Sequence, residues 1–147
     1  MYQRILIATD GTTLSKKAAA AGIELAELMG AQVVVLNVVP RYPVSYFEGG
    51  ISMNAADVSR IEKQWAENAQ GVVDAVKTKA EAAGLKAKAV TVKSDLVAES
   101  IISTAKKQKC DLIVMASHGR RGLKRLLLGS ETTHVLTHSH IPVMVLR

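Results

Sequence analysis

Residues 4–11 read Arg-Ile-Leu-Ile-Ala-Thr-Asp-Gly, a short aliphatic run that stops at an Asp-Gly pair. An aliphatic run without polar alternation is typical of a strand covered on both faces, as the strands of parallel sheets are. Similar runs occur at residues 32–38, 111–116 and 143–146. The pattern therefore predicts a parallel sheet with a layer of helices on each face.

The segment between the first two runs predicts a helix. Thr12 or Thr13 can cap it, because either hydroxyl can accept a hydrogen bond from an N–H of the first turn. The helix is expected to run to about Met29, where Gly30 is a natural end.

A second, longer helix is expected from about Asp57 to Gly84. Its predicted apolar face carries Val58, Ile61, Trp65, Val72 and Val76. Trp65 is expected in the core. Residues 40–55, which contain two prolines, two adjacent glycines and three aromatic residues, are expected to form a long loop of the kind that often acts as a lid.

The rest of the chain continues the alternation of strands and helices. Residues 86–93 alternate in polarity as a half-exposed strand does. Asp95 is expected to cap the next helix, and a helix of about two turns is expected to begin near Ser130. This order predicts a doubly wound, Rossmann-like α/β sandwich over a five-stranded, mostly parallel sheet.

Length and composition indicate an ordinary globular protein. The 147 residues are expected to form a single domain, and 48% hydrophobic with 22% charged residues is typical of soluble proteins. Cys110 is the one cysteine, so no internal disulfide can form; we expect a cytoplasmic location and an inert, packed thiol. Residues 1–10 do not resemble a signal peptide, and no apolar run approaches the roughly 20 residues of a membrane span.

The formal net charge of +6 is compatible with an anionic partner but does not identify one. Aromatic residues make up only 3% of the chain, and Tyr42, Tyr46 and Phe47 lie in one short segment. A protein that binds single-stranded nucleic acid needs aromatic residues distributed along a basic groove. Nucleic acid is therefore not the expected partner.

The segment from Ala116 to Ser130 has the pattern of a phosphate site, because it follows a strand and ends where a helix begins. Gly119 and Gly129 allow positive φ and a close approach of a ligand to the backbone. The first N–H groups of the helix lack helical partners and lie at the positive end of its dipole. The residues between the glycines include Arg120, Arg121, Lys124 and Arg125 and no acid. The alternative is a solvated basic loop.

On these residues the chain resembles the ATP-binding branch of the universal stress protein family, along its whole length. That branch carries the motif G-2x-G-9x-G-S/T after the fourth strand, and Gly119, Gly129 and Ser130 match its last three positions. Ala116 stands where the family has the first glycine, and it adds a methyl group at the point where the family's backbone faces the ribose. Residues 8–10 match the end of the family's first strand, and Val38 matches its valine beside adenine.

The resemblance implies the strand order 3-2-1-4-5, in which the chain reverses between the first and fourth strands. Ligands of open α/β sheets bind at such a switch point. The implied cofactor is ATP, ADP or AMP, with Mg²⁺ near Asp10. The implied site residues are Ala8, Thr9, Asp10, Val38, Met115, Ala116, His118, Gly119, Gly129, Ser130, Glu131 and Thr132.

Three of these features have other interpretations. Asp10 can bind a ribose hydroxyl or a magnesium ion, or can bond nearby N–H groups as a turn residue, and the two roles can coexist. Ser117 and His118 could form a hydrolytic pair, but adjacent residues on a loop rarely face each other. His134 and His138, with Glu131 at helical spacing and His140 just beyond, could bind zinc, or could simply be favoured by the helix dipole.

The expected function is that of a cytoplasmic stress-response protein that senses or regulates by binding an adenine nucleotide, with at most slow hydrolysis. The alternatives are a magnesium-dependent hydrolase or phosphotransferase that uses Asp10, and a protein or nucleic-acid interaction module. Residues 141–146 are apolar and form an exposed edge strand in the implied order, so we expect a homodimer through this strand.

Overall fold

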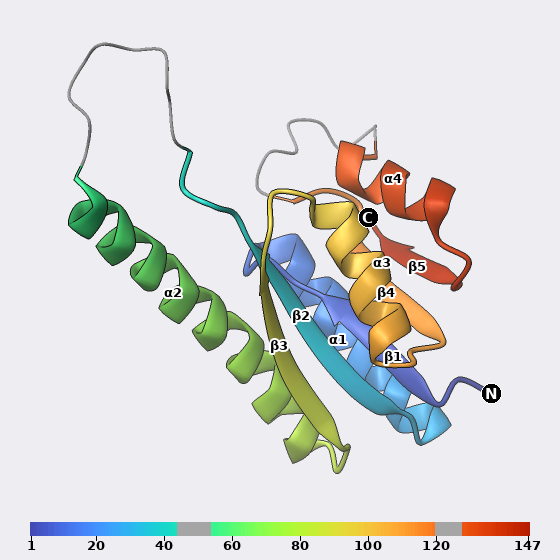
Figure 1. Cartoon of the computed structure of the whole chain (residues 1–147). Helices are drawn as coiled ribbons and strands as arrows, with labels where there is room; N and C mark the ends of the chain where they lie inside the picture. Colours follow the sequence, from blue (N-terminus) through green and yellow to red (C-terminus); the bar gives the residue numbers. More distant parts are fainter. Residues whose placement is uncertain (44–53, 120–127) are drawn as a thin grey trace.

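The computed structural model describes residues 1–43, 54–119 and 128–147, and it contains a five-stranded, entirely parallel sheet (Figure 1). The strand order is β3-β2-β1-β4-β5, as the resemblance implied. The strands are β1 (Arg4–Ala8), β2 (Gln32–Val39), β3 (Ala87–Lys93), β4 (Leu112–Ala116) and β5 (Val143–Leu146). The helices are α1 (Thr13–Met29), α2 (Ala55–Ala82), α3 (Val97–Lys107) and α4 (Ser130–His138).

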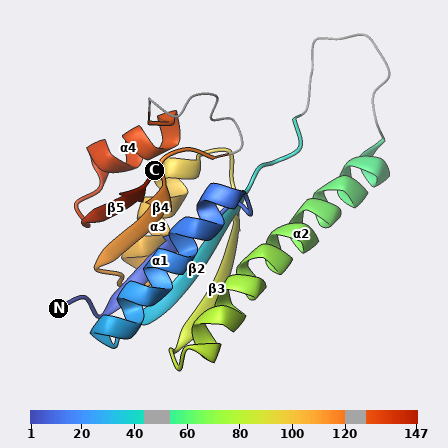
Figure 2. The same cartoon turned by 180° about the vertical axis from the view of Figure 1, so that it is seen from behind.

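The helices cover both faces of the sheet, α1 and α2 on one and α3 and α4 on the other (Figures 1 and 2). Alternate residues of each strand face opposite layers. In β1, Ile5 and Ile7 pack in the layer of α1 and α2, and Leu6 packs in the layer of α3 and α4. All three side chains are fully buried. The doubly wound sandwich predicted from the aliphatic runs is confirmed.

The ends of α1 form as expected. The Thr12 hydroxyl accepts a hydrogen bond from the Ser15 N–H at 3.3 Å, and Gly30 takes the left-handed conformation with φ of 65°. Helix α2 begins at Ala55, two residues before its expected start, because the Asn54 side chain caps it by accepting from the Asp57 N–H at 2.8 Å.

Trp65 is not in the core, contrary to expectation. The buried face of α2 consists of Ala69, Val73, Val76 and Ala80, all in its second half. The first half of the helix extends away from the sheet (Figures 1 and 2), so Trp65 is only half-buried. Its ring packs against that of Tyr42, with 5.9 Å between the centroids.

Asp95 does not cap α3, which corrects a second expectation. The N-cap residue is Leu96, and α3 has no capping hydrogen bond from it. The Asp95 carboxylate accepts instead from the Arg41 N–H at 3.0 Å. This bond ties the chain leaving β2 to the loop that joins β3 to α3.

Candidate nucleotide site

A cavity of about 470 Å³ lies at the carboxyl ends of β1, β2 and β4, where the strand order reverses. The β3–α3 loop and the first turn of α4 complete its wall. The cavity brings together all twelve residues that the resemblance implied: Ala8, Thr9, Asp10, Val38, Met115, Ala116, His118, Gly119, Gly129, Ser130, Glu131 and Thr132. Arg120, Arg121, Lys124 and Arg125, which the phosphate hypothesis also noted, lie outside the described residues, as do Tyr46 and Phe47.

Asp10 and Gly119 are in direct apposition, although 109 positions separate them in the sequence. A Cβ atom placed on Gly119 would lie 2.7 Å from Asp10 Oδ2, closer than any carbon side chain could sit. The end of β1 and the loop after β4 therefore converge on one point. Only a residue without a side chain leaves room for the carboxylate in this position.

The Asp10 carboxylate also shapes its own turn. Its Oδ1 atom accepts hydrogen bonds from the Thr12 N–H at 3.0 Å and from the Thr12 hydroxyl at 2.6 Å. Thr12 in turn caps α1, so the first turn of this helix fixes the orientation of the carboxylate. The turn role considered for Asp10 is thus present, and it holds Oδ2 on the side of Gly119.

The two motif glycines serve close packing rather than positive φ. Within the described residues, the glycines with positive φ are Gly11, Gly30 and Gly84, and Gly129 has φ of −63°. A Cβ atom on Gly129 would lie 3.3 Å from His118 Cα and 3.4 Å from the Ser117 carbonyl oxygen. Of the two properties that the sequence predicts for these glycines, positive φ is not used, and the close packing beside them is what the structure shows.

The N–H of Gly129 is not available to a ligand, because it donates to the Ser117 carbonyl at 2.8 Å. The N–H groups that begin α4 belong to Ser130, Glu131 and Thr132, and α4 has no side-chain cap. Such first-turn groups have no partner inside their own helix and favour an anion. The Thr132 hydroxyl donates to the Ala116 carbonyl at 3.0 Å and anchors this turn to the end of β4.

Ala116 fits the position where the family has glycine. It ends β4 in register with Leu146 and does not have positive φ. Its side chain is buried, at 7% exposure, and lies in the cavity wall. The extra methyl group therefore reduces the space of the cavity but does not strain the backbone.

Ser117 and His118 do contact each other, which overturns the argument that adjacent residues rarely do so. The Ser117 hydroxyl and His118 Nδ1 lie 3.1 Å apart. Ser117 is nevertheless 4% exposed and does not line the cavity, whereas His118 does. No carboxylate hydrogen bond to His118 occurs within the described ranges, so the third member of a hydrolytic triad has no counterpart there.

The histidines of α4 are occupied in other contacts. His134 pairs with Glu99 of α3 at 3.3 Å, and His138 Nδ1 lies 3.0 Å from the His134 carbonyl. Glu131 is bonded to α3. In the part of the chain that the structure describes, no three His, Cys, Asp or Glu side chains gather into a metal site, so the zinc alternative is not supported.

Sequence reasoning missed part of the cavity wall, namely Ser15, Leu36, Asn37, Ser94, Asp95, Val97 and Ile101. Two signals could have indicated these residues. Ser94 and Asp95 follow β3 directly, as Asp10 follows β1. Asn37 interrupts the apolar run of β2, is only 9% exposed and makes no side-chain hydrogen bond within the described residues. A buried amide in a cavity wall is placed to bond a ligand or water.

No helix within residues 1–43, 54–119 and 128–147 is long and apolar enough to cross a membrane.

The whole chain, residues 1–147, matches the family model described as the Universal stress protein family. Universal stress protein MJ0531 of Methanocaldococcus jannaschii is 35% identical over 147 residues, which cover all of this chain and 83% of that protein.

Solved structures share the fold. That of protein MJ0577, also from Methanocaldococcus jannaschii, has a TM-score of 0.83 and 28% identity, and the match covers 99% of this chain and 96% of the other. A universal stress protein solved in complex with cAMP has a TM-score of 0.71 and 23% identity, with coverage of 99% and 97%. At 23% identity, the similarity to the structure with cAMP establishes only the shared fold.

Proposed function

The chain belongs to the universal stress protein family, and we propose that it binds ATP or a related adenine nucleotide in the cavity at the switch point. The observation that carries the proposal is the apposition of Asp10 and Gly119 beside the uncapped first turn of α4. A volume of about 470 Å³ falls in the range of roughly 300–1,000 Å³ that small-molecule sites have. A family structure solved with cAMP supports an adenine nucleotide as the ligand class.

The phosphate groups would be held at the start of α4. The N–H groups of Ser130, Glu131 and Thr132 would donate to phosphate oxygens, with the Ser130 hydroxyl and the Gly119 N–H as further donors. Gly129 would contribute space rather than a hydrogen bond. A side chain at this position would crowd the backbone of His118, where a Cβ atom would lie 3.3 Å from His118 Cα.

The sugar and base would occupy the remainder of the cavity. Asp10 is placed to accept from a ribose hydroxyl or to bind Mg²⁺, a cation that prefers carboxylate and phosphate oxygens. Apolar side chains from three neighbouring elements line the wall next to Val38 and suit a flat base. They are Leu36, Val97, Ile101 and Met115. A bound magnesium ion would neutralise phosphate charge.

Efficient hydrolysis is not expected from this geometry. A phosphoryl transfer site needs a group that orients the attacking water and cations that stabilise the developing charge. Ser117 is buried outside the cavity, and His118 has no orienting carboxylate within the described residues. We therefore propose a sensor or regulator with slow turnover at most, acting in the cytoplasm as a homodimer.

Isothermal titration calorimetry of the purified protein with ATP, ADP and AMP, with and without Mg²⁺, tests the proposal. We expect saturable binding of at least one nucleotide, which weakens in Asp10→Ala. Thermal unfolding checks that this variant, which also loses the turn bonds to Thr12, remains folded. The absence of binding by any of the three nucleotides would disprove the proposal. Steady-state phosphate release well above the rate without protein would instead favour the hydrolase.

A further inference from the structure

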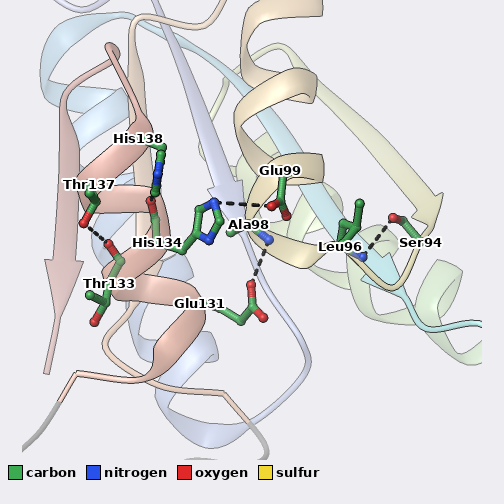
Figure 3. A network of polar contacts seen from close by, with 9 residues as sticks. All are labelled: Ser94, Leu96, Ala98, Glu99, Glu131, Thr133, His134, Thr137 and His138. Carbon is green, nitrogen blue, oxygen red and sulfur yellow. Dashed lines mark hydrogen bonds and ion pairs between the residues drawn. The ribbon is translucent and has the colours of Figure 1, made fainter.

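Glu131 is an acid in the first turn of the helix that we propose holds phosphate. A carboxylate left beside the phosphate groups would repel them. In the structure this side chain is bound by α3: Glu131 Oε2 accepts a hydrogen bond from the Ala98 N–H, in the first turn of α3, at 2.9 Å (Figure 3). The side chain crosses from one helix to the other and spans 33 positions of sequence.

Helix α3 requires such a partner. Leu96, at its N-cap, has no side-chain oxygen to accept from the first turn, and no side-chain cap forms. The first N–H groups of a helix must find acceptors outside it, and its positive end stabilises a negative charge. The Glu131 carboxylate supplies both the acceptor and the charge. The same residue thus lines the cavity and bonds α3 through its side chain.

The starts of the two helices that Glu131 joins both line the cavity. Ser94, Asp95 and Val97 line it from the β3–α3 loop and the start of α3, and Ser130, Glu131 and Thr132 line it from the first turn of α4. The loop is held at two further points. Ser94 Oγ accepts from the Leu96 N–H at 3.0 Å, and Asp95 accepts from the Arg41 N–H at 3.0 Å. The Glu131 bond connects the α3 end of this loop to α4.

We propose that Glu131 is a positioning residue of the nucleotide site. Its carboxylate fixes the separation of α3 and α4, and thereby the width of the cavity. By occupying the N-terminus of α3, it also leaves α4 as the end at which phosphate groups bind. The inference rests on the proposed function for the identity of the ligand, but not for the role of Glu131 between the helices.

Glu99 provides a matched control. Its carboxylate forms the other polar contact between these helices, with His134 Nε2 at 3.3 Å (Figure 3). Neither residue lines the cavity, and the two side chains are 51% and 37% exposed. Removing this contact tests whether any α3–α4 link has the same effect, or only the one made at the cavity.

The first experiment needs no nucleotide. Amide hydrogen exchange at Ala98, followed by NMR in the whole protein, compares the wild type with Glu131→Ala, Glu131→Gln and Glu99→Gln. We expect exchange about tenfold faster in Glu131→Ala, because a bond to a charged acceptor is lost. Glu131→Gln keeps an acceptor oxygen and is expected to restore protection in part, and Glu99→Gln is expected to match the wild type. Unchanged exchange in Glu131→Ala would overturn the inference.

The second experiment measures adenosine and ATP binding by calorimetry in the same variants. We expect Glu131→Ala to bind adenosine about tenfold more weakly, and Glu131→Gln and Glu99→Gln to stay within about twofold of the wild type. Glu131→Gln should also bind ATP within about twofold of the wild type, because the positive end of α3 already takes up the Glu131 charge. Wild-type adenosine affinity in Glu131→Ala would overturn the positioning role, and clearly tighter ATP binding in Glu131→Gln would show that the carboxylate opposes phosphate and would overturn the steering.

These outcomes separate the two proposals. If the wild type binds neither adenosine nor ATP, the proposed function fails, while the exchange of the Ala98 amide still decides whether Glu131 holds α3. If the wild type binds both ligands and Glu131→Ala binds them equally well with unchanged exchange, the inference fails and the proposed function stands.

Discussion

At the scale of single residues, the site depends on the absence of side chains at two positions. Gly119 leaves room for the Asp10 carboxylate, and Gly129 lets the start of α4 lie against the backbone of Ser117 and His118. Gly129 does so with ordinary dihedral angles, φ of −63° and ψ of 156°, which other residues adopt readily. Substitution there should consequently affect the cavity more than the fold.

Gly129→Val tests this directly. The β-branched side chain begins 3.3 Å from His118 Cα, so the loop after β4 must shift away from α4. We expect ATP affinity to fall at least about tenfold, with the far-ultraviolet circular dichroism spectrum unchanged. Calorimetry measures the affinity, and equal affinity in the variant would show that phosphate binds elsewhere. Gly71→Ala, on the exposed face of α2 with no atom within 4 Å of the new Cβ, is the control and should bind as the wild type does.

Cys110 illustrates the effect of burial on a titratable group. The thiol is 6% exposed, and burial raises its pKa from 9.0 to about 11. The unfolded chain therefore releases this proton at lower pH than the native protein does. This contribution to stability is complete below pH 9 and is lost as the pH rises toward about 11.

We accordingly expect the free energy of unfolding to decrease more steeply between pH 9 and about 11 in the wild type than in Cys110→Ala. Urea unfolding at a series of pH values measures the free energy of unfolding of both proteins. Subtracting the profile of Cys110→Ala from that of the wild type removes the contribution of other groups that titrate in the same range. Parallel pH profiles in the two proteins would contradict the prediction. Alkylation by iodoacetamide should also be slow at neutral pH, because a buried thiol with a raised pKa forms little thiolate.

At the scale of elements, glycine has different roles in helices α1 and α2. Gly22 is buried in α1 and faces the sheet, where a Cβ atom would lie 2.9 Å from Ile7 Cδ1 and 3.4 Å from Val114 Cγ1. Gly71 of α2 faces open space. One glycine lets its helix approach β1 and β4 closely, and the other merely lowers helix propensity.

Alanine substitution should therefore have opposite effects at the two positions. Gly71→Ala should raise the free energy of unfolding by about 0.5–1 kcal/mol, the ordinary gain for glycine replaced in a helix. Gly22→Ala gains the same propensity but overpacks the core, which costs about 1–3 kcal/mol, so we expect a net loss. Urea denaturation measures both, and a stabilised Gly22→Ala would show that α1 can move off the sheet at little cost.

At the scale of the whole molecule, the sheet has two edges of different character. The edge strand β3 carries the exposed lysines Lys88 and Lys93, which discourage pairing with another sheet. The other edge is β5, whose four residues are all apolar and half-exposed. An apolar edge of this kind is suited to pairing with a second copy across a twofold axis.

We expect the protein to sediment as a dimer at micromolar concentration and Val145→Pro to sediment as a monomer. The carbonyls of Pro142, just before β5, and of Leu146, at its end, accept from Ile113 and Ser117, so the even-numbered residues of this segment face β4. The backbone of Val145 points toward the free edge, where proline removes a donor without breaking the sheet. Circular dichroism checks that the variant is folded. A wild type that sediments as a monomer would disprove the dimer.

The fold class and the ends of helix α1 depend on residues that are close together in the sequence, so they could be predicted from the sequence. Aliphatic runs such as residues 4–9 need cover on both faces wherever they lie, so they specified a parallel sheet with two helical layers. The cap at Thr12 and the turn at Gly30 depend on backbone groups a few residues away, and both formed as predicted. The strand order and the site residues came from motifs that match a family, because periodicity carries no information about which strands are neighbours.

Contacts between distant segments were decided only by the tertiary structure. Trp65 has the spacing of a core residue, but α2 leaves the sheet before reaching it. Asp95 has the chemistry of a cap, but the Arg41 N–H, 54 positions away, competes for its carboxylate. Glu131 takes over the capping of α3 because the sheet order places α4 beside it. A polar side chain such as that of Asp95 or Glu131 can form any of several equivalent hydrogen bonds. The tertiary fold decides which partner comes within reach, and that partner lies too far away in the sequence to be predicted from the neighbouring residues.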